Sequence, residues 1–379
     1  HKKYNKNTHI TATRGTIMRR PLIALLALYI SNTTIQFNAA IGSFIRGHNS
    51  LAAHEGENTR EPPPCDNNIP DLLDSFANED PGEINRLRRI LAIENPTCFD
   101  KYFGNFAHHF LKRLKKVKKH LNLHIPKSGG SSFCSIGRHS KYGPGISSDT
   151  NCWERSHFYP MWCLFHFGTR PKWESCKDMD ASVPDFIMNE NYLDYPLCMQ
   201  QRLYSILIRD PVDRAISHEL HLEALKDNGH HNMHKKIFDA RLAMARMNYM
   251  TWALTADLVG DDKDRALEVP TKMHAQMAMD TLSRFDFLLE LSVNLRCDAE
   301  ILHFMGMGDQ VKEPHKNTDA GVAESEKHPP EKMSIYTEWN DLDLEVYHYA
   351  RRLMKADCDF YHKLLKSGWT NKRPSEIIM

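Results

Sequence analysis

The stretch LNLHIPKSGGSSF, residues 121–133, combines a short apolar alternation with a loop of small residues. Leu121, Leu123 and Ile125 alternate with polar residues, which is typical of a β-strand. A proline then ends the strand, and Lys127 stands directly before a run of glycine and serine. A strand, a small-residue loop and a helix in this order present backbone N–H groups and a positive helix end to a phosphate. This stretch therefore predicts a phosphate-binding loop.

The order of the loop residues differs from that of a nucleotide kinase. A kinase loop places its lysine after the glycines, and a hydroxyl residue that holds magnesium follows the lysine. Here Lys127 precedes Gly129 and Gly130. Because an ordinary turn is the alternative for this string alone, a second element is needed to assign it.

A second strand-to-helix junction lies in LYSILIRDPVDRAISHEL, residues 203–220. Its first six residues are strongly apolar and predict a strand, and Asp210 with Pro211 begins a helix that extends to the Asn-Gly pair at 228–229. Arg209 at the strand end and Ser217 two turns into the helix can face one site. A guanidinium with a hydroxyl suits a phosphate monoester. The alternative is that Arg209 only pairs with Asp210 or Asp213.

Both junctions resemble motifs of the sulfotransferases that use 3'-phosphoadenosine 5'-phosphosulfate (PAPS). PKSGGSS is similar to their 5'-phosphosulfate loop, and an Arg followed eight residues later by a Ser is similar to their 3'-phosphate motif. Three later segments look like parts of Golgi carbohydrate sulfotransferases: TLSRFDFLLELS (281–292), HKNTDAG (315–321) and EWNDLDLEVYHYARRLM (338–354). The last of these is similar to the C-terminal helix of the heparan sulfate 6-O-sulfotransferase branch.

The resemblance implies an α/β fold, a three-layer P-loop-like sulfotransferase domain with a mostly parallel central sheet, over residues 81–368. It implies transfer of a sulfuryl group from PAPS to a glycan hydroxyl without a metal. The residues that would bind the nucleotide are Lys127, Ser128, Gly129, Gly130, Ser131, Ser132, Arg209, Ser217, Asn317 and Thr318. Lys127 would also steady the charge that builds on the leaving phosphate.

The general base is expected to be a histidine, because its ordinary pKa of roughly 6.5 suits proton transfer near neutrality. The window WCLFHFGTRPKWESC (162–176) resembles a segment of the 6-O branch, and His166 is the matching residue. More residues separate His166 from Trp173 in this sequence than in the corresponding segment of that branch. The other candidates are His124, His157, His218 and Glu154.

The N-terminal region reads as a secretory signal or signal anchor. Six Lys or Arg and no acidic residue precede PLIALLALYI (21–30), which is the order of such segments. We expect a cytosolic tail and anchor or signal peptide over 1–45, a polar stem or linker over 46–80 and a C-terminal tail over 369–379. The protein would be a single-pass type II Golgi membrane protein with a lumenal domain, or secreted after cleavage. The alternative is a buried helix of a cytosolic protein.

Charge and cysteine content bear on partners and compartment. The formal net charge of +1 argues against a dedicated nucleic-acid binder. The run LKRLKKVKKH (111–120) is either a solvated helix face or a rim that attracts a polyanion, so the glycan acceptor could be acidic. Nine cysteines without CxxC spacing favour disulfides in the secretory lumen over a zinc site. Their pairing is open, although Cys163 with Cys176 would close a short loop.

Overall fold

The computed structural model describes a single compact unit within residues 62–379. The described residues are 65, 67–140, 142, 152, 176–177, 185–189, 192–193, 197–227, 247–255, 269–291, 297–308 and 330–368. The predicted anchor, most of the predicted stem and the predicted C-terminal tail lie outside them. Within the described part, no helix is both long and apolar enough to cross a membrane.

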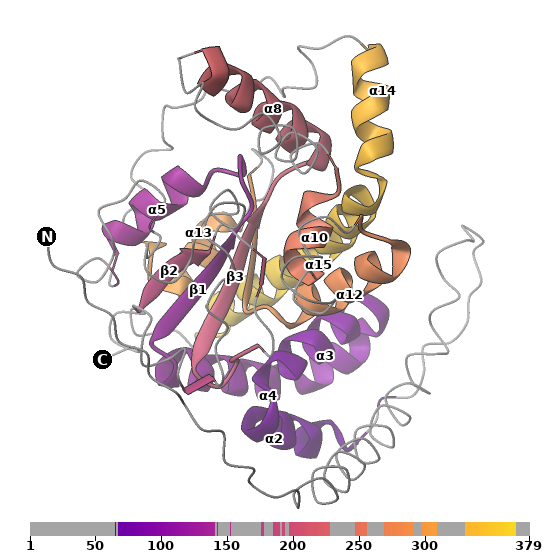
Figure 1. Ribbon diagram of the computed structural model, residues 1–379. Helices are drawn as coiled ribbons and strands as arrows, with labels where there is room; N and C mark the ends of the chain where they lie inside the picture. Colours follow the sequence, from indigo (N-terminus) through magenta and orange to yellow (C-terminus); the bar gives the residue numbers. More distant parts are fainter. Residues whose placement is uncertain are drawn as a thin grey trace, which may run out of the picture. The chain divides into compact units, whose positions relative to one another are not determined.

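The described strands form one sheet in which every pair is parallel, so the fold is of the α/β class (Figure 1). The strands are β1 (Lys119–His124), β2 (Phe186–Asn189), β3 (Arg202–Ile208) and β4 (Phe287–Glu290), in the order β2-β1-β3-β4. Leu121 of β1 lies opposite Ile187 on one side and Tyr204 on the other. The strands predicted around residues 121–125 and 203–208 are thus confirmed, and the structure shows that they pair with each other.

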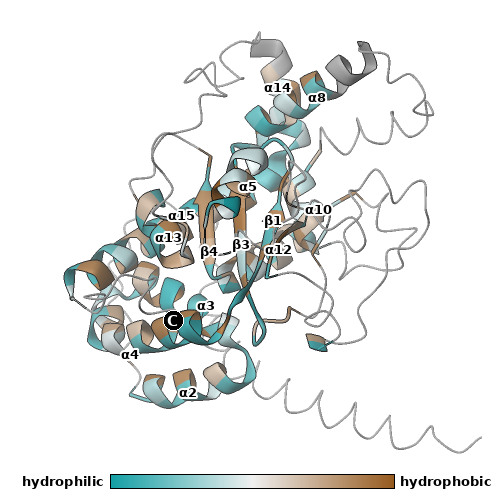
Figure 2. Cartoon of the chain, turned by 90° about the vertical axis from the view of Figure 1, so that its left-hand side faces the viewer, coloured by the Kyte–Doolittle hydropathy of each residue, from teal (hydrophilic) through white to brown (hydrophobic). Residues whose placement is uncertain are grey.

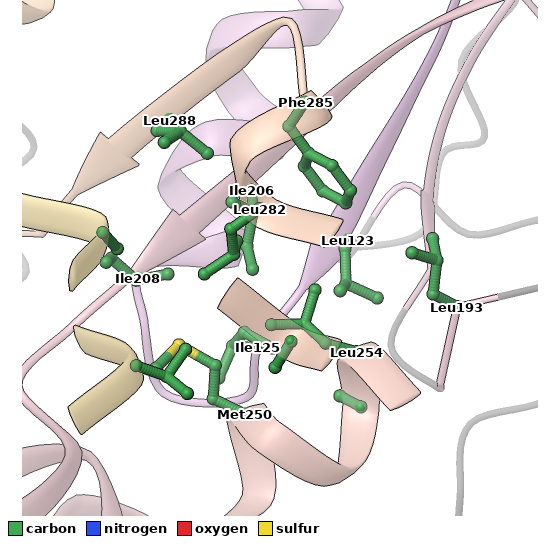
Figure 3. Packing of buried hydrophobic residues seen from close by; sticks show 14 of the residues in the cluster. Leu123, Ile125, Leu193, Ile206, Ile208, Met250, Leu254, Leu282, Phe285 and Leu288 are labelled. Atoms are coloured by element: carbon green, nitrogen blue, oxygen red, sulfur yellow. The ribbon is translucent and has the colours of Figure 1, made fainter. Parts of the chain in front are cut away.

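One face of the sheet packs against three helices, α10 (Tyr249–Thr255), α12 (Lys272–Arg284) and α15 (Asp341–Lys366). Leu123 of β1 and Ile125, which directly follows β1, meet Ile206 and Ile208 of β3 on this face, and all four are buried (Figure 3). The period of two that predicted β1 therefore reflects this apolar core.

The other face lies against α4 (Pro96–Lys116), α5 (Gly130–Arg138) and α13 (Asp298–Met305). Its contacts are largely aromatic: Phe110 of α4 meets Phe287 of β4 and Phe304 of α13, with ring centroids 6.2 and 5.7 Å apart. Phe133 of α5 packs on Phe186 of β2. In Figure 2 the strands stand at the centre, between α13 on one side and α10 and α12 on the other.

The polar residues of β1 point to this second face and are buried with it. His120 and Asn122 both bond the Ser205 hydroxyl of β3, at 2.7 and 2.8 Å. His124 continues the same row at the end of the strand and is also buried. Since a parallel sheet is covered on both sides, the alternation of β1 does not mark a solvent-facing side.

Two further helices, α8 (Pro211–Asp227) and α14 (Pro330–Trp339), lie together beyond the end of the sheet where β1 and β3 finish (Figure 1). Val212, Ala215 and Ile216 of α8 pack against Tyr336 of α14. The predicted start of α8 is confirmed, because the Asp210 carboxylate accepts hydrogen bonds from the backbone N–H groups of residues 212 and 213.

The N-terminal helices differ in part from the sequence reading. Asp80 caps α3 (Pro81–Glu94) as expected, but the helical pattern that continues to residue 117 is divided, because Asn95 ends α3 and caps α4. A further helix, α2 (Ile69–Glu79), lies within the stretch that we expected to be stem or linker. Its apolar residues recur one turn apart and pack on α3 and α4, while the Cys65–Cys98 disulfide fastens the chain before it.

Four disulfides join eight of the nine cysteines: Cys65–Cys98, Cys134–Cys152, Cys176–Cys198 and Cys297–Cys358. The expected use of cysteine in disulfides is borne out. The pairing of Cys163 with Cys176 is wrong, because Cys176 is bonded to Cys198 beside the start of β3. Cys163 lies outside the described residues.

Candidate nucleotide site

The loop after β1 turns sharply into α5. Lys127 and Gly129 both have left-handed backbones, with φ of 67° and 86°. Glycine adopts this conformation readily, whereas a lysine there is strained by roughly 1–3 kcal/mol. The chain is held by a bond from the Ser128 N–H to the Ile125 carbonyl, at 3.2 Å. The loop thus fixes the backbone of Lys127 directly before the N-terminus of α5.

The small residues of the loop are surrounded on the inside. A side-chain carbon at Gly129 would lie 3.0 Å from Leu291, and one at Gly130 would overlap the His124 ring. Ser128 is fully buried, and among the described residues its hydroxyl has no hydrogen-bond partner. Close packing is therefore a second reason for the glycines, besides the access of a phosphate to backbone N–H groups.

The second predicted motif lies beside the first, at the end of the sheet where β1 and β3 finish. Arg209 follows β3, and its Nη1 donates to the carbonyl of Lys127 at 3.3 Å. β1 pairs with β2 on one side and with β3 on the other, so the two loops leave the sheet at a topological switch point. In open parallel sheets, ligands bind in the crevice at such a point.

The alternative assignment of Arg209, as a simple partner of nearby carboxylates, has no support in the geometry. Asp210 directs its Oδ1 to the backbone N–H groups of α8, at 3.0 Å each. Among the described residues, no ion pair joins Arg209 to Asp210 or Asp213. Lys127 and Arg209 are both half-buried, so the site has two cations that remain partly accessible.

Helix α8 brings Ser217 and a further histidine to the side of the helix that faces away from α14. Ser217 is half-buried, and His221 lies one turn beyond it and is exposed. Partial burial, and then the positive charge of Lys127, lower the pKa of His221. His221 therefore lies near Lys127, and both effects favour its neutral form. Sequence reasoning missed it, although its spacing of four residues from Ser217 on a predicted helix was a usable signal.

The other candidate bases are placed differently. His124 lies under the loop, and burial lowers its pKa to about 4. His218 is half-buried on α8. The remaining predicted site residues and candidate bases lie outside the described residues: Glu154, His157, His166, Asn317 and Thr318. Ser131 and Ser132 occupy the first turn of α5, exposed and half-buried respectively.

The basic run at 111–120 does not form a rim around this loop. Lys112, Lys115 and Lys116 are exposed in the last turns of α4, which lead into the start of β1, whereas the loop follows its end. Strands rise about 3.3 Å per residue, so the basic run and the loop lie at opposite ends of β1. Arg113 of the same run is a core residue, because its Nε and Nη2 donate to the Asp286 carboxylate at 2.7 and 2.9 Å.

A separate hollow of about 410 Å³ lies between the starts of α10 and α12 and the junction of α14 with α15. Neither Lys127 nor Arg209 lines it. In the part of the chain that the structure describes, no group of three or more His, Cys, Asp or Glu side chains is placed to hold a metal ion.

Comparisons of the chain with protein-family models, with curated proteins and with solved structures found no match.

Proposed function

We propose that the protein is a PAPS-dependent sulfotransferase that transfers a sulfuryl group to a hydroxyl of a glycan or polysaccharide. The observation that carries this proposal is the bond between Arg209 and the Lys127 carbonyl. It brings together two motifs that are 82 residues apart, at the edge of a parallel sheet where ligands bind. The all-parallel sheet with helices on both faces supports a three-layer, P-loop-like domain for this function.

The nucleotide would lie across the two junctions. Lys127, the N–H groups of residues 128–130 and the hydroxyls of Ser131 and Ser132 would hold the 5'-phosphosulfate at the start of α5. Ser128 would turn its buried hydroxyl toward the same group. Arg209 and Ser217 would hold the 3'-phosphate, because a planar guanidinium binds phosphate oxygens in pairs. Asn317 and Thr318 stay predicted nucleotide contacts.

The reaction would be an in-line displacement at sulfur. The sugar hydroxyl oxygen forms a bond to the sulfur while the bond from sulfur to the 5'-phosphate oxygen breaks. The hydroxyl proton passes to a base, and adenosine 3',5'-bisphosphate leaves with the bonding electrons. Lys127, on the phosphosulfate side, would stabilise the charge that develops on the leaving phosphate.

Two histidines compete for the role of base in this proposal. The resemblance assigns it to His166. Within the described residues, His221 is an exposed histidine whose pKa is lowered by partial burial and then by the charge of Lys127. A base must be neutral before it accepts the hydroxyl proton, and the charge of Lys127 favours that state in His221. Replacing each histidine separately decides between them.

The proposed setting is the secretory lumen, with a signal anchor holding the protein in the Golgi membrane, or secretion after cleavage. The disulfides support it, since such bonds persist in oxidising compartments. The acceptor would be a glycan, including the acidic polysaccharides.

The test is transfer of label from PAPS to a panel of neutral and acidic polysaccharides by the full chain, without added metal. We expect label in one class of glycan. Lys127→Ala should reduce transfer by about 10²–10³-fold, as does removal of a group that stabilises transition-state charge. Lys112→Ala, an exposed lysine at the opposite edge, should not. Of His166→Ala and His221→Ala, the variant of the base should lose transfer and still bind adenosine 3',5'-bisphosphate.

Two alternatives give different results in the same assay. A nucleotide- or glycan-binding module without catalysis would bind adenosine 3',5'-bisphosphate and transfer no label to any acceptor. A lumenal kinase would require a divalent metal and would transfer phosphate from ATP. Absence of any binding to adenosine 3',5'-bisphosphate would overturn the assignment of the loop itself.

A further inference from the structure

His124 lies directly beneath the candidate phosphate loop. It is the last residue of β1, and its side chain points to the face of the sheet that α5 covers, in one row with His120 and Asn122. The side chain is 4% exposed, so a sugar hydroxyl in solvent has no path to its ring. This burial separates His124 from the candidate bases, and its role must be exerted through the residues that it touches.

The closest of these residues is Gly130, the first residue of α5. An added Cβ at Gly130 would overlap the Nε2, Cε1 and Cδ2 atoms of the His124 ring. The ring edge and the backbone of Gly130 are therefore in direct van der Waals contact. Because Gly130 carries one of the N–H groups that α5 offers to an anion, the position of the ring determines the position of that donor.

The ring also contributes no charge to the loop. Burial alone lowers the pKa of His124 to about 4, so it is neutral at pH 5 and above. The nearest titratable groups along the chain are His120 on the same strand and Lys127 in the loop, and from α8 His221 faces Lys127. Because the His124 ring is neutral, Lys127 and Arg209 supply the positive charge that would attract a phosphate.

We propose that His124 is a positioning residue, whose buried ring supports Gly130 and thereby sets the phosphate-binding geometry of the loop. This inference rests on the proposed function, since it concerns the same nucleotide site. It implies that residues 124 and 130 act as one unit. A change at either one displaces the first turn of α5, and changing both does not add a second loss.

The test is the affinity of the full chain for adenosine 3',5'-bisphosphate by calorimetry, with thermal unfolding as a check on folding. We expect His124→Ala and Gly130→Ala each to weaken binding at least tenfold. The double variant should bind no more weakly than His124→Ala, because the space left by the ring accepts the new methyl group. Gly104→Ala is the matched control, since no heavy atom outside its own turn lies within 4 Å of an added Cβ in α4.

The pH dependence separates positioning from a direct ionic contact. His124→Gln keeps a neutral polar side chain, so it should bind within about threefold of the wild type and with the same pH profile between pH 5 and 8. A wild type that gains affinity on acidification, relative to His124→Gln, would make His124 a cationic ligand and overturn the proposal. Losses that multiply in the double variant, or an unchanged affinity of His124→Ala, would overturn it as well.

Failure of this inference is distinguishable from failure of the proposed function. If the wild type does not bind the nucleotide, both are overturned. If the wild type binds the nucleotide and His124→Ala binds it equally well, only the inference about His124 is overturned. Should His124→Ala not unfold cooperatively, Gly130→Ala decides, because it keeps the ring: it must weaken binding at least tenfold while Gly104→Ala does not.

Discussion

Arg209 lies where β3 ends and bonds the loop that follows β1, so we expect substitutions there to be felt in the loop. One of its nitrogens is engaged with the Lys127 carbonyl at 3.3 Å, and the rest of the guanidinium is available to an anion. A guanidinium holds both groups in one plane, whereas an ammonium is a single point of charge. In the proposed nucleotide site, an arginine at this position would therefore serve the loop as well as the ligand.

We predict that Arg209→Lys weakens binding of adenosine 3',5'-bisphosphate about tenfold, or about 1.4 kcal/mol, and that Arg209→Ala weakens it further. The lysine keeps the charge but cannot bond the loop carbonyl and a phosphate in the same plane. Titration calorimetry measures both values. Arg352→Ala, an exposed arginine on α15, is the control and should bind as the wild type does. Equal affinity of Arg209→Lys and the wild type would contradict the fork geometry.

At the residue scale, the sequence predicted where the charged residues lie in the fold, but it did not predict how they are packed. Lys127, Arg209 and the capping role of Asp210 follow from local order, because each stands at the end of a strand or the start of a helix. The burial of His124 and the strained backbone of Lys127 do not follow from local order, since both depend on the packing of α5 against the sheet. No local pattern reveals a contact of that kind.

Helix α10 illustrates why element boundaries escape local reasoning. Its N-terminal N–H groups at Met250 and Thr251 are bonded by the Asp343 carboxylate, at 2.8 and 2.7 Å, from the start of α15. In return, Asn248 accepts a bond from the backbone N–H of Asp343 at 3.0 Å. Each helix start is thus capped by the other, across more than ninety residues of sequence.

We predict that Asp343→Asn lowers the free energy of unfolding by about 1–2 kcal/mol, the usual effect of losing a cap. An amide has one accepting oxygen where the carboxylate uses two. Urea unfolding followed by circular dichroism measures the change. Glu345→Gln, exposed and two residues further along α15, should change it by less than about 0.5 kcal/mol. A loss of equal size in both variants would show that the cap does not stabilise the helix pair.

The elements that could be predicted were those with their own start signals. The strand around 121–125 alternates and ends at a proline, the strand around 203–208 is a continuous apolar run, and the helices α3 and α8 each begin with an aspartate cap and a proline. Helix α2 was missed because its polar, proline-rich flank is typical of a linker. Its apolar residues are buried only by packing on α3 and α4, which local sequence does not reveal. The short strands β2 and β4 are four residues each, too few to establish a period.

Across the whole unit, Asp357 joins the N-terminal helices to the C-terminal one. It lies buried in α15 and accepts bonds from Arg88 and Arg89 of α3, at 2.7 to 2.9 Å. Arg89 also donates to the carbonyls of Ser283, in the last turn of α12, and of Phe285, directly after that helix, at 2.8 and 2.7 Å. One carboxylate therefore holds together segments from both ends of the described chain.

The pH dependence of this cluster has a definite sign. Burial acts to raise the pKa of Asp357, but the Arg89 and Arg88 guanidiniums outweigh it, so the pKa lies below the ordinary value of 3.8. A carboxyl whose pKa is lower in the folded state stabilises the fold at every pH above the unfolded value. We expect this contribution to the free energy of unfolding to be constant above pH 5 and to decline as the pH falls below about 4.

We predict that Asp357→Asn lowers the free energy of unfolding by about 3–5 kcal/mol at pH 7, because it leaves two buried guanidiniums without a counter-charge. Asp359→Asn, two residues further along α15 and exposed, is the matched control and should change stability by less than about 0.5 kcal/mol. Urea unfolding at pH 7 and again at pH 3.5 tests both statements. The difference between the wild type and Asp357→Asn should be smaller at the lower pH, since protons then bind to Asp357 in the unfolded chain and offset part of its contribution to stability. A difference that is small at pH 7, or that grows on acidification, would contradict the charge-based account of how α3 and α15 are held together.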